Sequence, residues 1–292
     1  MDRHFTPLLV VGIVLFSMAG TSAQAQIEAQ TQAPDEISRP LTFGVVPQQS
    51  ATKLAEMWVP LLRLLSEKTH RDIKFATAKD IPTFEKRLSE GAYDFVYMNP
   101  LHYDIYSRKH GFVAFAKEQD KQIRGVVVVR KDSPYAKLED LEGENLAFPS
   151  PLAFASSVLP RTQFDHEKIN VTPNYVGSHD SVYRAVAKGL FAGGGGIERT
   201  LASINENIRS QLRTIWTSKG YAPHAFAAHP RVPNAVVHSL QFALTHIWFD
   251  PRGNDALAAA NLGAIGPARD ADWKNVHELC ETIPIMLERE GR

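Results

Sequence analysis

The sequence predicts two α/β lobes that face each other across a cleft. Short apolar runs typical of strands alternate with helical patterns from residue 41 to residue 218. The order of elements also repeats. Each half contains, in order, a strand, a proline-containing loop, a helix, a second strand, an acid-capped helix that ends at a glycine, a third strand, a polar or glycine-rich corner and a further helix. Residues 87–97 and 184–194 therefore occupy equivalent places in the two halves. Two such lobes bring strand ends and helix N-termini together around one cleft, where open α/β sheets bind ligands.

The first half begins with an apolar strand at 41–46. A long helix follows, in which Trp58 and several leucines recur at helical spacing. A second strand is expected at 73–76. Asp80 is placed to cap the next helix, and Gly91 is placed to end it.

The strand at 93–98 runs into a polar corner that is the first candidate for a site. Pro100 ends the strand and has its φ set for the first turn of a helix. Ligands of open α/β sheets lie beyond such strand ends, near free helix N–H groups. The alternative is an ordinary βα turn with two core tyrosines. The side chains that would crowd this spot are Tyr97, Asn99, His102 and Tyr103.

The second half repeats this plan around a continuous apolar run at 125–130, which is typical of a strand buried on both faces. Residues 178–181 cap a helix that stops at Gly189. The glycines 193–196 lack the Gly-Lys-Ser/Thr ending of a P-loop, so they indicate either positive φ or close approach of backbone to a ligand. Other strands are expected at 145–148, 171–176, 190–192 and 212–218, and the last returns the chain to the first lobe, giving two crossovers and a hinge.

Charge and cysteine content exclude several classes of partner and bond. Lys+Arg and Asp+Glu number 32 each, so there is no basic field for nucleic acid and no polybasic tract for anionic lipid. Cys280 is the only cysteine, which excludes an internal disulfide. We expect it to be a buried small hydrophobe rather than a nucleophile.

The N-terminus predicts export. An apolar run from Pro7 to Gly20 leads to Ala23-Gln24-Ala25, a small-x-small pattern, so 1–25 is interpreted as a signal peptide cut after Ala25. A retained anchor is the alternative, although the run is short for a transmembrane helix. Residues 26–40 form a polar, flexible leader. The mature chain is therefore expected in the periplasm, without membrane insertion.

Several segments together resemble a known family. The matching segments, in order, are Phe43-Gly44-Val45-Val46-Pro47-Gln48, the helix with Trp58, Tyr93-Asp94-Phe95-Val96-Tyr97, 128–134 and Gly177-Ser178-His179-Asp180-Ser181. Over roughly residues 41–275 they resemble the periplasmic phosphate/phosphite/phosphonate-binding proteins of ABC importers, the PhnD-like proteins. The resemblance implies a type II periplasmic-binding-protein fold that closes on its ligand as a hinged clamp, without catalysis and without a cofactor.

The resemblance also implies where an anion would sit. In the family, a Ser-Thr-Ser-type run opens the first helix of the second lobe, helped by a tyrosine, a histidine and an acid. Tyr97 falls on the family tyrosine and His179 on the histidine. The hydroxyl run is replaced by Ala153, Phe154 and Ala155, and the acid falls at about Phe191. High phosphonate affinity by the usual family mode is therefore not expected, and a smaller, more apolar or aromatic ligand is equally compatible with Phe154.

These observations define the expected organisation and site. Lobe 1 comprises 41–122 and 224–292, and lobe 2 comprises 123–223. His224 and His229 have no supporting Cys or acid cluster, so no metal site is expected. Asp180 and Ser181 are better explained as helix caps than as ligand contacts. The expected ligand contacts are Tyr97, Asn99, Gln48, Ser50, Ser156, Ser157, His179 and Ser178.

Two functions fit this organisation. The first is a monomeric solute-binding protein that captures a small oxyanion or organic anion and delivers it to an ABC permease. The second is a sensory module whose closed state signals to a membrane receptor or histidine kinase. An enzymatic interpretation would need an acid/base pair or a nucleophile elbow, and the sequence contains neither pattern.

Overall fold

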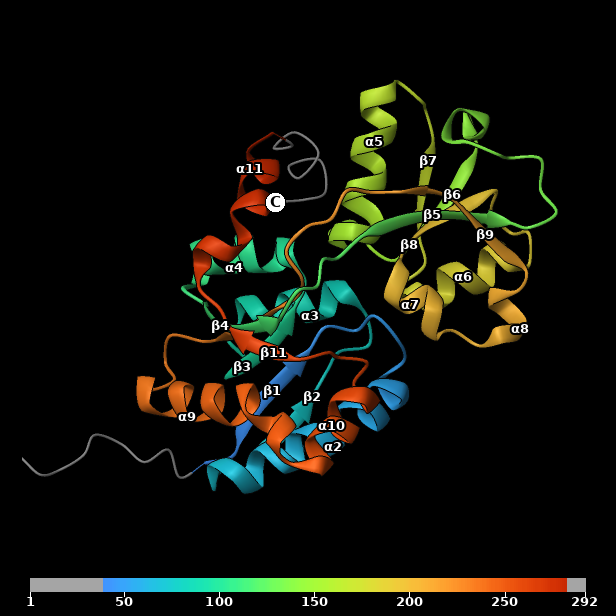
Figure 1. Cartoon of the computed structure of the whole chain (residues 1–292). Helices are drawn as coiled ribbons and strands as arrows, with labels where there is room; N and C mark the ends of the chain where they lie inside the picture. Colours follow the sequence, from blue (N-terminus) through green and yellow to red (C-terminus); the bar gives the residue numbers. More distant parts are fainter. Residues whose placement is uncertain (1–38, 283–292) are drawn as a thin grey trace, which may run out of the picture. The chain divides into compact units, whose positions relative to one another are not determined.

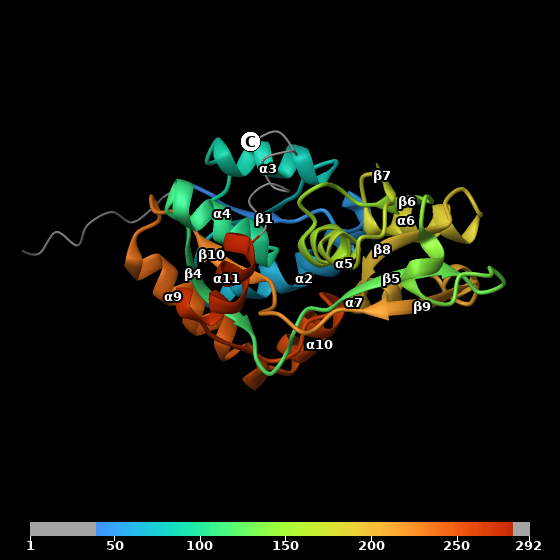
Figure 2. The ribbon, with the colours of Figure 1, turned by 90° about the horizontal axis from the view of Figure 1, so that it is seen from above.

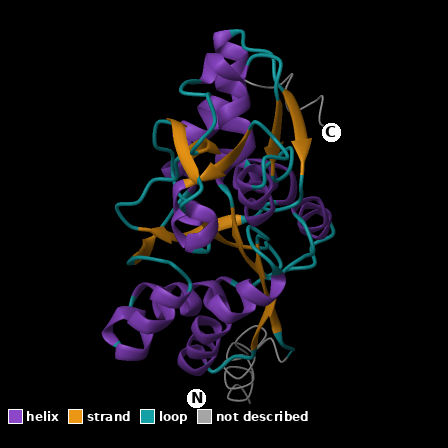
Figure 3. Ribbon diagram, turned by 90° about the vertical axis from the view of Figure 1, so that its right-hand side faces the viewer, coloured by secondary structure: helices purple, strands orange, loops and turns teal. Residues whose placement is uncertain are grey.

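The computed structural model describes residues 39–282 of the chain. The signal peptide expected at 1–25 and nearly all of the leader expected at 26–40 lie outside the described residues. Within them the chain builds two separate β-sheets, and helices (purple) lie against the strands (orange) in Figure 3. No helix in this part of the chain is both long and apolar enough to cross a membrane.

The first sheet has six strands and is mixed. Its central strands β1 and β3 are parallel, whereas β10 runs antiparallel to β3. This reversal arises because β10 belongs to the last third of the chain and returns into a sheet begun by the first third. The spatial order is β11 (Ile265–Pro267), β4 (Val113–Glu118), β10 (Ala225–Ala228), β3 (Phe95–Met98), β1 (Leu41–Val45) and β2 (Ile73–Ala76).

Helices cover both faces of this first sheet (Figure 1). One layer holds α2 (Ala51–Thr69), α9 (Asn234–Thr245) and α10 (Pro251–Ala259), and the other holds α3 (Ile81–Ser89), α4 (Pro100–His110) and α11 (Lys274–Thr282). Asp80 caps α3 as predicted, since its carboxylate accepts a hydrogen bond from the Thr83 amide at 2.8 Å. The single-turn helices η3 (Ile247–Phe249) and η4 (Asp270–Trp273) connect the later elements.

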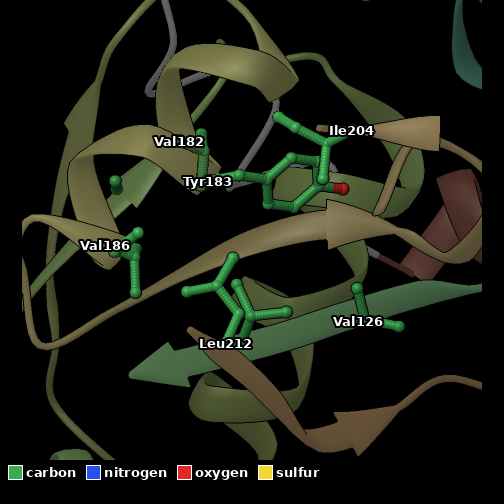
Figure 4. Close-up of a cluster of buried hydrophobic side chains, with 9 residues drawn as sticks. Val126, Val182, Tyr183, Val186, Ile204 and Leu212 are labelled. Atoms are coloured by element: carbon green, nitrogen blue, oxygen red, sulfur yellow. The ribbon is translucent and has the colours of Figure 1, made fainter. Parts of the chain in front are cut away.

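The second sheet has five strands in the order β7 (Thr172–Tyr175), β6 (Asn145–Phe148), β8 (Gly193–Ile197), β5 (Gly125–Arg130) and β9 (Leu212–Thr217). The prediction that β5 is buried on both faces is confirmed. Val126 and Val128 pack toward Val182, Tyr183 and Val186 of α6 (His179–Ala187), as Figure 4 shows for the labelled residues. Val127 and Val129 pack toward Phe164 of α5 (Leu159–Glu167), so alternate residues serve opposite layers. The remaining elements are η1 (Leu138–Leu141), the π-turn η2 (Phe154–Val158), α7 (Glu198–Ser203) and α8 (Glu206–Arg209).

The expected position of strand β8 was wrong. The sequence predicted a strand at 190–192 that opens into the glycines 193–196, but these glycines themselves form the strand. None of the four has a positive φ, whereas Gly189, which precedes the strand, has a φ of 71°. A Cβ on Gly195 would overlap the carbonyl oxygen of Ser156, and one on Gly196 would meet the ring of Tyr183. The glycines therefore let neighbouring helices lie directly on the strand, which is close backbone approach within the protein.

Two chain segments connect the sheets. Residues 119–124 join β4 to β5, and residues 218–224 join β9 to β10. They run side by side, because Ile123 and Tyr221 form an isolated antiparallel bridge (Figure 2). Trp273 anchors the second connection from the first lobe, since its indole N–H donates to the Pro223 carbonyl at 2.8 Å. The result is two α/β lobes joined by a two-crossover hinge.

Candidate ligand-binding site

A small cavity of about 10 Å³ lies where the two lobes and both connections meet. That volume is close to the space of one water molecule. Its lining comes from loops and helix starts beyond strand ends, the position at which open α/β sheets bind ligands. The lining residues are Val46, Gln48, Ile81, Asn99, Ile123, Ala153, Phe154, Ala155, Ser156, His179, Ile197 and His224.

The second lobe lines the cavity with the residues that begin η2. In η2 the first intrahelical bonds start at the Ser157 amide, which donates to the Ala153 carbonyl at 2.7 Å. The amides of residues 154–156 precede that bond and have no earlier helical carbonyl to reach. Free N–H groups at the start of a helix favour an anion. Ala153, Phe154 and Ala155, which the resemblance places at the family's hydroxyl run, all line the cavity.

His179 lies in this wall as a neutral imidazole. Its side chain is 2% exposed, and its two ring nitrogens contact the hydroxyls of Ser156 (3.1 Å) and Thr200 (2.9 Å). Burial lowers the pKa of His179 from 6.5 to about 3, because a buried imidazolium would lose its hydration. His179 can therefore exchange hydrogen bonds with a ligand but carries no positive charge near neutral pH.

The first lobe contributes Gln48 and Asn99, and both also bond across the interface. The Asn99 amide nitrogen donates to the Leu152 carbonyl at 3.2 Å while its side-chain oxygen caps α4. The backbone carbonyl of Gln48 accepts a hydrogen bond from the His179 amide at 3.2 Å. The Gln48 side chain contacts Nε2 of His224 at 3.0 Å. These contacts hold the two walls of the cavity together.

Tyr97 is not part of the cavity lining and lies behind His224, which is. Its ring stacks on His224, with centroids 4.9 Å apart, and packs against Trp58 at 4.6 Å. Its hydroxyl accepts a hydrogen bond from Nη1 of Arg199 at 2.9 Å. The other arm of that guanidinium pairs with Glu118, whose side chain is 3% exposed. Burial raises the pKa of Tyr97 to about 12, so the phenol stays protonated.

The remaining predicted contacts have local structural roles. Ser50 caps α2 and Ser178 caps α6, each accepting a backbone N–H bond through its hydroxyl. Ser157 is fully buried, and its hydroxyl has no partner within residues 39–282. Phe191 packs against the cluster around Val182. Of the eight expected contacts, the structure brings Gln48, Asn99, Ser156 and His179 to the cavity, whereas Tyr97, Ser50, Ser157 and Ser178 are outside its lining.

The sequence analysis did not predict three residues that lie at or beside the cavity. His224 was considered only as a metal ligand, yet it forms part of the cavity wall. Arg199 and Glu118 pair across the lobes, and they are 81 positions apart in the chain. No local pattern signals such a pair. The described residues contain no group of three or more potential metal ligands.

Comparison with known proteins decides the family. The family model for ABC transporter, phosphonate, periplasmic substrate-binding proteins matches residues 43–273, most of the chain. The chain belongs to this family. Members of the phosphonate-binding family are substrate-binding components of transporters and not enzymes, so the small cavity is part of a transport protein.

Individual relatives of the family are distant in sequence and close in fold. The chain is 20% identical to the phosphate-import protein PhnD of Mycolicibacterium smegmatis, over 91% of this chain and 92% of that one. A structure of PhnD1 from Prochlorococcus marinus in complex with methylphosphonate superposes with a TM-score of 0.77 at 16% identity, covering 84% of this chain and 98% of that one. The binding component of an ABC phosphonate transporter from Pseudomonas aeruginosa gives 0.77 at 15%, covering 82% and 85%. The periplasmic-binding-protein fold predicted from the sequence is thereby confirmed.

Proposed function

We propose that this chain binds a small oxyanion of the phosphonate or phosphate type between its lobes and presents it to an ABC permease. The observation that carries the proposal is the lining formed by η2 and His179: residues 154–156, whose amides precede the first helical hydrogen bond, line a cavity at the lobe interface, inside a fold whose family binds phosphonates. The binding of phosphate or methylphosphonate by relatives supports the ligand class.

The proposed binding mode relies on backbone amides more than on side-chain hydroxyls. Ser156 is the one hydroxyl in the cavity lining, and it already contacts His179. Each charge-assisted hydrogen bond contributes about 1.5–3 kcal/mol, so losing the hydroxyls at 153–155 weakens the anion site. We expect affinity below that of a relative with the complete run. Gln48, Asn99 and His179 are the side chains proposed to orient the ligand.

Binding requires the lobes to separate first. A cavity with room for about one water does not admit a tetrahedral oxyanion with its oxygens. The segments 119–124 and 218–224 are placed to act as the hinge. We take lobe 1 as 41–122 with 224–292, and lobe 2 as 123–223. A cleaved signal peptide at 1–25, a periplasmic location and a monomeric state complete the proposal.

A thermal-shift screen tests the ligand class. The chain from residue 26, stripped of co-purified ligand, is heated with methylphosphonate, phosphite, phosphate, a sulfonate or a small carboxylate. A ligand at one hundred times its Kd adds about 2.7 kcal/mol, which raises the Tm by roughly 5–10 °C for a protein of this size. A flat response to every class would refute the proposal.

Two variants locate the site. His179→Ala removes a cavity-lining side chain and should weaken whichever anion binds. Tyr97→Ala, behind the wall, should weaken it through loss of the packing that positions His224. Lys131→Ala, at an exposed position of the second lobe, is the matched control. Unchanged affinity in both site variants would show that the ligand binds elsewhere.

A further inference from the structure

A second, larger cavity adjoins the small one. It has a volume of about 540 Å³ and shares Ile123, Ile197 and His224 with the small cavity, so those three side chains are a common wall. This hinge chamber lies against the connection 121–124 and the start of α7. A volume of this size is in the range of small-molecule pockets. The charged residues of its lining are Glu118, Lys121, Arg124, Glu198 and Arg199.

The lining of the hinge chamber carries an excess of positive charge. Arg199 is neutralised by its pairing with Glu118. Arg124 instead donates to two uncharged acceptors, the Ser218 carbonyl at 3.2 Å and the Gln122 side-chain oxygen at 3.1 Å. Within residues 39–282 no carboxylate pairs with Arg124 or with the exposed Lys121. Glu198, also exposed, is the only acid of the lining outside the Arg199 pair.

We propose that the hinge chamber receives a second acidic group of the ligand. The ligand class is then a phosphonate or phosphate ester that carries a carboxylate or second phosphoryl group a few bonds from the first. This inference rests on the proposed function, because it assumes that the first anionic group lies against the amides of residues 154–156. The part of the ligand that joins its two acidic groups then runs past His224, and the second acidic group accepts hydrogen bonds from Arg124.

The opposite ligand, one with an amine at its far end, fits the chamber less well. An ammonium group there would approach Arg124 and Lys121, and like charges repel at short range in a partly buried site. The one acid free to attract it is Glu198, which is exposed and therefore screened by solvent. Arg124 also suits a carboxylate or phosphate because its planar guanidinium can donate two parallel hydrogen bonds.

Calorimetric titration of the chain from residue 26 tests this inference. Three ligands differ only beyond the phosphonate: methylphosphonate, 2-carboxyethylphosphonate and 2-aminoethylphosphonate. We expect the carboxyethyl ligand to bind about tenfold or more tightly than methylphosphonate, as one added charge-assisted contact predicts. In Arg124→Gln the ratio of the two Kd values should fall by about the same factor. Arg130→Gln, which alters a half-buried arginine at the far end of β5, should leave the ratio unchanged.

The possible outcomes separate this inference from the proposed function. Equal affinity for the three ligands, tighter binding of the aminoethyl ligand, or a ratio unaffected by Arg124→Gln would overturn the hinge-chamber inference while leaving phosphonate binding intact. Failure of all three ligands to bind would overturn the proposed function and this inference with it. A melting curve of Arg124→Gln like that of the parent chain verifies that the variant is folded.

Discussion

His179 shows how burial sets the chemistry of the site. Its ring nitrogens are held by Ser156 and Thr200, and burial keeps it neutral. An anion in the cavity would therefore meet hydrogen-bond donors rather than a formal charge on this wall. The proposed site would therefore discriminate among ligands by geometry more than by total charge, because backbone amides are fixed in direction.

The same histidine predicts a pH dependence of stability. The pKa of His179 is about 3 in the folded chain against about 6.5 when unfolded, so the unfolded state takes up a proton first as pH falls. Its contribution is complete above pH 6.5 and is lost progressively as pH falls toward 3. Below about pH 6 this adds a slope of roughly 1.4 kcal/mol per pH unit to the free energy of unfolding.

Denaturant unfolding between pH 7.5 and 5 measures that slope. His179→Gln keeps a hydrogen-bonding side chain but cannot titrate, so its stability should fall less steeply with pH. His238→Gln changes an exposed histidine and serves as the control. If His179→Gln and the parent chain lose stability at the same rate, the imidazole is not held neutral by burial.

Local chemistry made several residues predictable, whereas contacts distant in sequence did not. Asp80 was assigned as a helix cap because a cap is decided within three residues of sequence, and the structure confirms it. Residues 178–181 were also assigned to a cap, but the capping side chain is Ser178, which was expected to contact ligand, and not Asp180 or Ser181. The Arg199–Glu118 pair depends on how two lobes close, and neither residue carries a local signal. Tyr97 was chosen by resemblance, but its place behind His224 follows from packing that only the structure shows.

At the level of elements, strand β8 is defined by what packs on it. Glycine has low β-propensity, so a run of four is hard to recognise as a strand from sequence. The strand forms because η2 lies against β5 and β8: Cβ atoms on Gly125 and Gly195 would overlap the carbonyl oxygens of Ala155 and Ser156. The same close packing fixes the residues of η2 that line the cavity. The glycine content of β8 and the proposed anion site therefore depend on the same packing.

Gly195→Ala tests this requirement. The added methyl group would overlap the Ser156 carbonyl and lie 2.7 Å from Phe148, both in the buried interior, so η2 must shift. We expect a loss of about 1–3 kcal/mol or more in unfolding free energy, together with weaker anion binding. Gly263→Ala is the control, since its Cβ would have ordinary contacts at 3.5 Å and beyond. A Gly195→Ala protein as stable as Gly263→Ala would contradict the packing argument.

For the whole molecule, the described lobes are held together by contacts the protein makes with itself. Arg199 joins Glu118 and Tyr97 across the interface, and Asn99 joins Leu152. The two-lobe plan was predictable because the order of elements repeats along the chain. The contacts between the lobes were not predictable, because they depend on the relative placement of side chains from both halves. A bound ligand must either replace some of these contacts between the lobes or make contacts in addition to them.

Glu118→Gln should open the molecule without unfolding it. The change removes a charge that is 3% exposed and leaves Arg199 without its carboxylate partner. Breaking a fully buried pair costs about 3–5 kcal/mol, and because Arg199 is itself 28% exposed we expect a smaller loss. Because the pair spans the lobes, we expect separation at the hinge and a larger radius of gyration in solution X-ray scattering. Glu56→Gln, on the exposed side of α2, is the control. An unchanged radius in Glu118→Gln would show that the pair does not hold the lobes closed.

Direct titration with oxyanions tests the central claim most sharply. The chain from residue 26, freed of bound ligand by unfolding and refolding, is titrated with methylphosphonate, phosphite and phosphate in a calorimeter. The account predicts saturable binding of at least one of them, with one ligand per chain. Absence of binding by all three, in protein whose melting curve shows a folded state, would contradict it.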